Sequence, residues 1–480
     1  MLFQNRYNQL DSKLYTSQSP KPLHGAKAGH FNVALADELQ WSTDEKALWV
    51  EICSGQHPLS DCSALAMVYA GHQFGHWAGQ LGDGRGLLLA QVLNKKNQVI
   101  DLHLKGAGLT PYSRGGDGRA VLRSVIREYL AGHALNSLGV PSSNAVGFTS
   151  SQQGVQRETL EPGAMLLRTS DCHIRFGHFE WINQYAPELL GDFAMQCIAW
   201  HYPECLEDPQ PILSFARAVV KRTAKMIADW QAVGFAHGVM NTDNLNITGS
   251  TLDFGPFGFL ERFKPDWINN HSDHQGRYCY QNQPRMAHWN LSILLNNLMP
   301  LAPHTEKESF KQHMIACLAD FEVTFLQHYQ KKMCFKMGLP QFHKESFECT
   351  LHFLQILQRE KLDYTQSFIR LQEGHFNALK DDCIDRDGFD AFMQRYQSIR
   401  IHQDQAQLND SMQQHNPRYI LRNHMAQQAI ERAEHDDFSE VTRLFALLAT
   451  PFTHQPAQER ASDLQPPHID ATEIAISCSS

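Results

Sequence analysis

The stretch that most constrains the fold of this chain runs from His237 to Gly255 and reads HGVMNTDNLNITGSTLDFG. Its oxygen-bearing side chains lie on both sides of a short apolar segment: Asp243 and Asn244 precede the segment, and Asp253 follows it. Carboxylate and amide oxygens are the ligands that Mg²⁺ and similar hard cations prefer, and phosphate and water usually complete the shell. The stretch therefore predicts a loop–strand–loop segment that holds a divalent cation together with a phosphorylated ligand.

One position in this stretch departs from the pattern of kinase-like enzymes. In those that act on small molecules, a His-Gly-Asp triplet supplies the catalytic carboxylate, and a metal-binding Asn follows after four more residues. Here Val239 stands in place of that Asp, while Asn244 keeps the expected spacing. A Val side chain cannot accept a proton, so an ordinary kinase mechanism would lack its base. Asp243 is the carboxylate in the loop that can replace it.

The N-terminal half predicts a strand hairpin that ends at a lysine. Residues 87–93 and 99–105 have strand patterns and are joined by a short polar turn. Apolar and polar side chains alternate along the second strand, so Lys105 projects from the face opposite the apolar one. An amphipathic helix at 119–138 follows a glycine-rich loop and carries Glu128 on the flank of its apolar stripe. Kinases hold nucleotide phosphates with such a Lys–Glu pair, although a solvent-exposed pair would give the same pattern.

The remaining patterns complete the expected architecture. Residues 63–77 have helical spacing, 163–169 form a strand pattern, and 214–233 and most of 288–455 are helical in pattern. A chain of 480 residues with 42% hydrophobic and 19% charged residues has the composition of an ordinary globular protein with room for two lobes. We expect an α+β, bilobal fold of the protein-kinase type: a mixed α/β N-lobe over 1–180, a mainly helical C-lobe with helical additions over 181–455, and a flexible tail over 456–480.

Composition also limits the partners and the compartment. The net charge of −9 argues against broad nucleic-acid binding. No apolar run approaches the roughly 18 residues that span a bilayer, and the N-terminus lacks the core of a signal peptide, so we expect a cytoplasmic protein without membrane contact. Eleven cysteines without a CxxC pair favour reduced thiols. His72 and His76 are spaced like helical metal ligands, but the Glu of an HExxH motif is missing, so we interpret them as packing or surface residues.

Two groups of residues have the chemistry to bind a polyphosphate. The turn containing Gly82 and Gly84 lets backbone N–H groups approach phosphate, and Arg85 adds a guanidinium that can bind two phosphate oxygens. The second group comprises Asp117, Gly118, Arg168 and Arg175. Glycine turns and surface arginines are common, so neither group is specific by itself. The chain has no GK[ST] motif, which excludes a Walker-type phosphate loop.

Three longer motifs carry a specific resemblance. GHQFGHWAGQLGDGRG, LKGAGLTPYSRGGDGRAVLRSVIREYL and HGVMNTDNLNITGSTLDFGPFGF resemble the selenoprotein O (SelO, bacterial YdiU) family, and the resemblance extends over essentially the whole chain. It implies a pseudokinase of kinase fold that binds ATP in a flipped orientation with Mg²⁺ or Mn²⁺. It also implies transfer of AMP, and in bacterial relatives of UMP from UTP, to Ser, Thr or Tyr hydroxyls of protein substrates.

The functional residues of that family map onto this chain by residue type. The resemblance makes Asp243 the proton acceptor, Asn244 and Asp253 the metal ligands, and Glu128 the partner of Lys105. It also implies a set of nucleotide contacts: Gly82, Gly84, Arg85, Lys105, Asp117, Gly118, Arg168, Arg175 and Asp253. Some members of the family carry selenocysteine near the C-terminus where this chain has Cys478.

A redox role is one interpretation of the tail thiol. Cys478 could form a disulfide with Cys279 in the polar loop at 265–287 and so constrain that loop, which would make a thiol-redox protein a partner. An inert tail thiol is the alternative.

Two other functions remain open from the sequence. One is ordinary phosphotransfer, and the other is a catalytically inactive scaffold that binds nucleotide, as Val239 suggests. Flipped ATP accounts for the departures from the kinase pattern, because an inward γ-phosphate would let Arg and Lys stabilise a pyrophosphate leaving group. The α-phosphorus would then face the incoming hydroxyl near the metal. We therefore expect nucleotidyl transfer.

Overall fold

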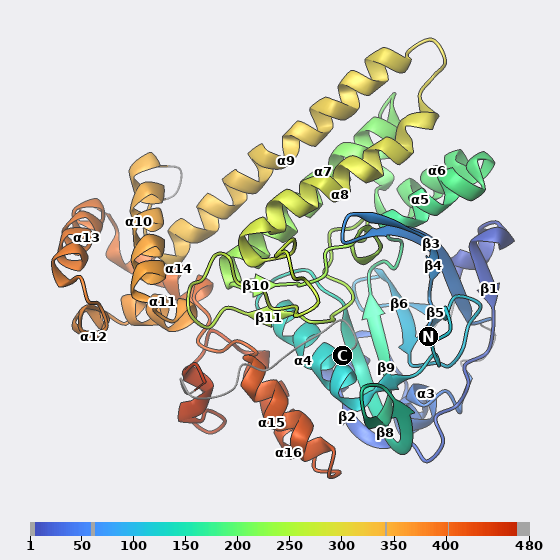
Figure 1. The fold of residues 1–480 in the computed structure, drawn as a ribbon, viewed down its shortest axis with the longest axis horizontal. Helices are drawn as coiled ribbons and strands as arrows, with labels where there is room; N and C mark the ends of the chain where they lie inside the picture. Colours follow the sequence, from blue (N-terminus) through green and yellow to red (C-terminus); the bar gives the residue numbers. More distant parts are fainter. Residues whose placement is uncertain (1–4, 59–62, 341–342, 402, 468–480) are drawn as a thin grey trace.

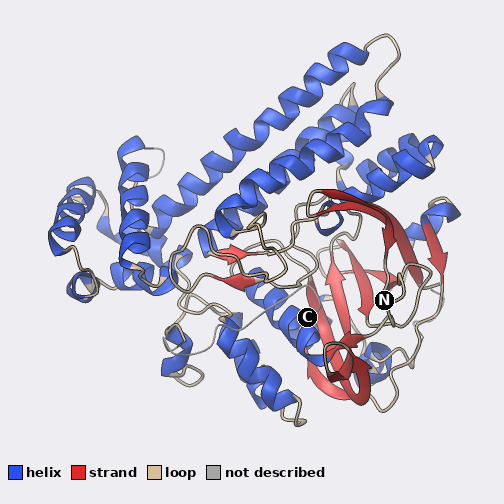
Figure 2. Ribbon diagram, viewed as in Figure 1, coloured by secondary structure: helices blue, strands red, loops and turns tan. Residues whose placement is uncertain are grey.

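The computed structural model describes residues 5–58, 63–340, 343–401 and 403–467, and strands and helices are separated along the chain (Figure 1, Figure 2). Most strands precede residue 171, and long helices follow it. The strands are β1 Tyr15–Ser17, β2 Lys27–Phe31, β3 Leu65–Gln73, β4 His76–Gly82, β5 Gly86–Leu93, β6 Val99–Lys105, β7 Ala120–Val121, β8 Asn144–Gln156, β9 Leu160–Ser170, β10 Phe235–Ala236 and β11 Gly258–Phe259. The helices up to the middle of the chain are α1 Val33–Glu38, α2 Thr43–Ala47, α3 Trp49–Cys53, α4 Leu122–Ser137, α5 Phe176–Tyr185, α6 Leu190–His201, α7 Pro211–Val233 and α8 Gln283–Leu298. The later helices are α9 Lys307–Lys336, α10 Lys344–Glu360, α11 Tyr364–Gln372, α12 Phe376–Asp381, α13 Arg386–Arg400, α14 Gln405–His415, α15 Asn423–Ala433 and α16 Ser439–Ala449.

The strands of the N-terminal half form one antiparallel sheet. Within the described ranges its order is β1-β3-β5-β6-β9-β8-β2, with β4 paired to β3 and β7 paired to β9. β5 and β6 form the predicted hairpin, in which Leu93 lies opposite Val99 and Gly86 lies opposite Lys105. This register places the glycine-rich turn at 82–86 beside Lys105.

Residues 63–77 form β-structure, so the helix predicted there is wrong. β3 and β4 make a hairpin whose tip residues, Phe74 and Gly75, have positive φ angles of 50° and 86°. β3 is buried on both sides, because Ala66 packs into one hydrophobic cluster and Met67 into another. A strand buried on both faces has a continuous apolar sequence, which periodicity cannot distinguish from a buried helix.

Helix α4 covers the sheet and positions Glu128. It packs against β8 and β9, and its other side contacts α15 and α16 (Figure 1). The helix begins at Leu122, slightly later than predicted, because Ala120 and Val121 pair with β9 as β7. It ends before Gly139, whose φ of 76° is the left-handed conformation that favours glycine at a helix C-terminus.

The C-terminal half is helical, as predicted. α7, α8 and α9 lie side by side, and α9 alone spans 30 residues (Figure 1). Helices α10–α14 surround a separate hydrophobic cluster at the end of α9. No helix in the described ranges has both the length and the apolar character needed to cross a membrane. The fold is therefore mixed α and β, with the sheet N-terminal and the helices C-terminal.

Part of the predicted flexible tail is anchored. Glu459 accepts a hydrogen bond from Arg418 Nε at 2.7 Å, and the buried Asp463 pairs with Arg443 at 2.8 Å. Charge-assisted pairs of this kind fix a segment when they are partly withdrawn from water. The packed part of the chain therefore extends beyond 455, which differs from the predicted boundary of the tail.

Candidate active site

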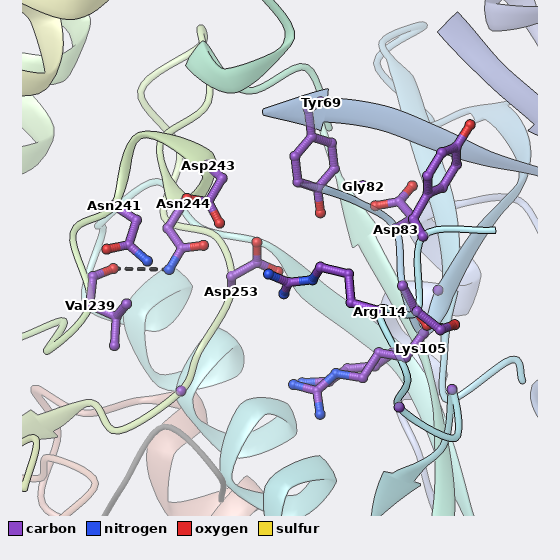
Figure 3. A pocket seen from close by; sticks show the side chains of 18 of the residues that line it. Tyr69, Gly82, Asp83, Lys105, Arg114, Val239, Asn241, Asp243, Asn244 and Asp253 are labelled. Atoms are coloured by element: carbon purple, nitrogen blue, oxygen red, sulfur yellow. Dashed lines mark hydrogen bonds between the residues drawn. The ribbon is translucent and has the colours of Figure 1, made fainter. Parts of the chain in front are cut away.

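A cavity of about 560 Å³ lies where the sheet meets the loops that precede α8. It brings together residues that are far apart in the sequence. Figure 3 shows Asp243, Asn244 and Asp253 on one side of the cavity and Lys105 on the other. The sequence-predicted site residues that line it are Gly82, Gly84, Arg85, Lys105, Asp117, Gly118, Arg168, Arg175, Asp243, Asn244 and Asp253.

Lys105 is held from behind by a buried carboxylate. Glu128 on α4 is 2% exposed and pairs with Lys105 Nζ, and its other oxygen lies 3.3 Å from Arg168 Nη1. Burial lowers the pKa of Lys105 to about 8 despite the nearby carboxylate. Burial raises the pKa of Glu128, but the charges of Lys105 and Arg168 outweigh that effect and leave it below its ordinary value. These contacts exclude the alternative of a solvent-exposed surface pair.

Two arginines enclose Asp253. Arg168 Nη1 donates to Asp253 Oδ1 at 2.6 Å, and Arg175 contacts Asp253 Oδ2. Arg175 Nη1 also donates to the carbonyl oxygen of Asp243 at 2.7 Å, and its guanidinium lies 4.9 Å from the centre of the Tyr69 ring. Both arginines are buried, and these contacts hold their guanidinium groups in place. Together with Lys105 they form a cationic wall of the cavity, to which a polyphosphate would be complementary.

Asp243 lies in a 3₁₀ turn, Thr242–Asn244, and is 7% exposed. Its Oδ2 accepts a hydrogen bond from Gln73 Nε2 at 3.1 Å. Burial raises the pKa of Asp243, and the hydrogen bond from Gln73 and the charge of Arg175 oppose that shift. Val239 is buried and also lines the cavity, so an apolar side chain stands at the position where the kinase sequence pattern has its Asp.

Asn244 and Asp253 carry oxygens of the kind that a divalent cation binds. Asn244 Nδ2 donates to the carbonyl oxygen of Val239 at 3.0 Å, which leaves Asn244 Oδ1 for another partner. The part of the chain that the structure describes contains no cluster of three or more His, Cys, Asp or Glu suited to a metal. Two protein oxygens that line one cavity are a donor set of the kind expected for Mg²⁺, which takes its other ligands from phosphate and water.

The glycine-rich segments pack closely on each other at the rim. A Cβ at Gly84 would lie 2.7 Å from the carbonyl oxygen of Tyr112, so only glycine fits there. Asp117 is exposed and pairs with Arg157 through two bonds of 2.8 and 3.1 Å. Arg85 is exposed to the cavity, and no carboxylate of the described residues lies within ion-pair distance of its guanidinium. Arg85 is therefore available to a ligand, whereas Asp117 holds the rim.

Several cavity residues escaped the sequence analysis: Tyr69, Gln73, Asp83, His103, Arg114 and Asn241. His103 Nδ1 lies 3.3 Å from Arg168 Nη2 and can accept its hydrogen bond. His103 is two residues from Lys105 on the same strand, so the alternation along β6 could have revealed it. Gln73 could not be found in this way because its segment was predicted to be a helix.

Two further predictions concern residues outside this cavity. His72 Nδ1 lies 2.6 Å from Glu180 Oε2, and its ring packs between Trp77 and Trp289, which confirms a packing role. Cys279 is buried, and burial raises the pKa of its thiol. Cys478, its predicted redox partner, lies outside the described residues.

Comparison with known proteins identifies the family. The family model described as "Protein adenylyltransferase SelO" matches residues 1–449. The chain is 44% identical over 491 residues to protein nucleotidyltransferase YdiU of Pectobacterium carotovorum subsp. carotovorum (strain PC1), covering 100% of this chain and 99% of the relative. It is 45% identical over 491 residues to the protein of the same name from Yersinia pseudotuberculosis serotype O:1b, with the same coverage. The chain therefore belongs to the SelO family of protein adenylyltransferases and is a nucleotidyltransferase.

Proposed function

We propose that this enzyme transfers AMP from ATP, and UMP from UTP, to Ser, Thr or Tyr hydroxyls of proteins in the cytoplasm. The observation that carries the proposal is the replacement of the kinase base by Val239 while Asp243 lines the same cavity as Asn244 and Asp253. The pairing of Lys105 with Glu128 matches the kinase pattern, but in this proposal the bond that breaks lies between the α- and β-phosphates.

The proposed step is an in-line displacement at the α-phosphorus. The acceptor hydroxyl gives its proton to Asp243, and its oxygen forms a bond to the α-phosphorus. The bond from that phosphorus to the oxygen bridging the α- and β-phosphates breaks, and pyrophosphate leaves with the electron pair. Lys105, Arg168 and Arg175 neutralise the leaving group when the triphosphate lies with its γ-phosphate inward.

A divalent cation, Mg²⁺ or Mn²⁺, would be held by Asn244 and Asp253. When bound, it neutralises phosphate charge near the reacting phosphorus. Asp253 is already paired with Arg168 and Arg175, so a cation and the phosphates would share these charges as a network. This arrangement supports the proposal because the residues that would hold the cation and the cationic wall line the same cavity.

Labelled ATP tests the proposed reaction directly. Incubation of the enzyme and bacterial lysate proteins with α-labelled ATP should leave label on protein, whereas γ-labelled ATP should leave none. Retention of label from γ-labelled ATP alone would favour ordinary phosphotransfer. Asp243→Ala should abolish α-label transfer while Mg²⁺–ATP binding persists, and unchanged labelling by this variant would contradict a role for Asp243 as base.

The redox proposal concerns Cys279 and Cys478. Because the Cys279 thiol is buried, a disulfide to the tail would require the 265–287 loop to open, so oxidation would alter the surroundings of the site. Non-reducing peptide mapping after oxidant treatment should recover a Cys279–Cys478 cross-linked peptide that a thiol-redox protein such as thioredoxin removes. Recovery of both cysteines only as free thiols would dismiss the link.

A further inference from the structure

The tip of the β3–β4 hairpin is fastened to the loop that carries Asp243. The backbone N–H of His72 donates to Thr242 Oγ1 at 2.8 Å. The backbone N–H of Phe74 donates to Asn241 Oδ1 at 3.1 Å and to Tyr278 Oη at 2.9 Å. The residue between these two anchors is Gln73, so its backbone is fixed from both sides. Its side chain therefore starts from a defined position.

Gln73 directs that side chain at the carboxylate of Asp243. Its Nε2 donates to Asp243 Oδ2 at 3.1 Å. The other oxygen, Oδ1, is buried without a hydrogen-bond partner among the described residues, and a Cβ at Gly71 would lie 2.7 Å from it. Gly71 thus lets the carboxylate pack against β3, and the burial of Oδ1 closes it off from a substrate hydroxyl. Oδ2 is the oxygen that remains for a reacting hydroxyl.

The chemistry of an amide is well matched to this position. A carboxylate oxygen has lone pairs for more than one hydrogen bond, so Oδ2 can accept a hydrogen bond from Gln73 and still take the proton of the substrate hydroxyl. A Lys or Arg here would form a charge-assisted bond and make the carboxylate a weaker base. The neutral amide orients the carboxylate without adding a charge.

From this geometry we infer that Gln73 is a positioning residue for nucleotidyl transfer, which holds Asp243 Oδ2 in line with the acceptor hydroxyl. The inference rests on the proposed role of Asp243 as base. The hairpin tip would thus hold the carboxylate of Asp243 through Gln73, while Arg175 holds the backbone carbonyl of Asp243.

Gln73→Met tests the inference because it keeps the length of the side chain and removes the donor. We expect kcat for transfer of α-label to protein to fall by about 10- to 100-fold, as for a misplaced catalytic group. The KM for ATP should change less than about threefold, since the phosphate-binding cations are untouched. Gly71→Ala, which places a methyl group against Oδ1 of the same carboxylate, should lower kcat in the same way.

Gln80→Met is the matched control. Gln80 lies on β4 of the same hairpin, and its Oε1 accepts a hydrogen bond of 3.1 Å from Trp181 Nε1, away from the base. The Gln80→Met variant should retain the wild-type kcat. A wild-type kcat in Gln73→Met, or an equal loss in Gln80→Met, would overturn the inference while the proposed function stands. A wild-type enzyme that transfers no α-label would overturn both.

Discussion

At the scale of single residues, the site is defined by where its charges are fixed. The carboxylate of Glu128 pairs with Lys105 and Arg168, and the carboxylate of Asp253 contacts Arg168 and Arg175. Burying a charge is costly unless the charge is paired, so each of these groups depends on the others. The same network that holds these side chains in place would present positive charge to a triphosphate.

Lys105→Met should weaken nucleotide binding because it removes a buried cation and keeps the apolar stem. We expect the dissociation constant for Mg²⁺–ATP to rise by about 10- to 100-fold, a loss of roughly 1.4 to 2.7 kcal/mol. Isothermal titration calorimetry measures this change. Lys96→Met, in the exposed turn between β5 and β6, is the control and should bind ATP as the wild type does. Equal affinities for the two variants would contradict contact between Lys105 and the phosphates.

Glu128→Gln should destabilise the protein because it leaves the cations of Lys105 and Arg168 without their shared carboxylate. Removing one partner from a buried ion pair costs about 3–5 kcal/mol. Urea unfolding should show a loss of this order without ligand, and saturating Mg²⁺–ATP should restore part of it. Glu161→Gln removes the partly exposed partner of Arg123 and should cost less than about 1 kcal/mol. A similar loss in both variants would argue against a special role for the buried pair.

At the scale of elements, the loop at 106–118 depends on close backbone contact. Gly118 has a φ of 71°, and a Cβ there would lie 2.1 Å from the carbonyl carbon of Gly108. Gly115 in the same loop has a φ of 81°, but a Cβ there would meet no atom within 4 Å. Alanine substitutions at these two glycines therefore separate the energetic cost of a positive φ from the cost of a steric clash.

Gly118→Ala should be much more harmful than Gly115→Ala. The positive φ alone costs about 1–2 kcal/mol in each variant. The clash adds to this in Gly118→Ala and moves the loop from the turn at 82–86, so both the midpoint of thermal unfolding and the affinity for ATP should fall further. Differential scanning fluorimetry with and without ATP measures both effects. Equal shifts in the two variants would show that the loop adapts to the extra methyl group.

The elements also show what could be predicted from the sequence. Alternation and turn chemistry were sufficient for the β5–β6 hairpin, and 3.6-residue periodicity was sufficient for α4 and α7. β3 was missed because burial on both faces removes the alternation that identifies a strand. The wrong helix prediction also hid two residues of the site, since Gln73 and Tyr69 lie on β3. Contacts such as that of Gln73 with Asp243 join distant segments, and no local pattern reports them.

At the scale of the whole molecule, α9 connects two hydrophobic clusters. Phe310 and Phe321 pack with the cluster that includes α4 and α7, whereas Met333 packs with the helices α10–α13. Lys336 lies at the end of α9 inside the second cluster and is 2% exposed. Its Nζ is 4.5 Å from the centre of the Phe368 ring and 3.4 Å from the carbonyl oxygen of His415. No carboxylate of the described residues pairs with it, so this buried cation is stabilised only by dipoles and rings.

Lys336 should make the stability of the protein depend on pH. Burial lowers the pKa of Lys336 from its ordinary value of 10.5 to about 7. Between these values the unfolded chain binds a proton that the folded chain has lost, so this group makes the free energy of unfolding rise with pH from about 7 to 10.5. Below pH 7 the folded protein must carry the buried charge, so the stability that the neutral lysine contributes at high pH is lost.

Lys336→Met removes the charge, keeps the volume and should remove this dependence. We expect the variant to be more stable than the wild type by about 1–3 kcal/mol at pH 7, with the difference narrowing towards pH 10. Urea unfolding at a series of pH values measures it. Lys331→Met, on the exposed side of the same helix, should leave the pH profile of the wild type unchanged. If the difference between Lys336→Met and the wild type stays constant from pH 7 to 10, Lys336 keeps its proton in the folded protein, and the rings and the His415 carbonyl stabilise its charge as well as water does.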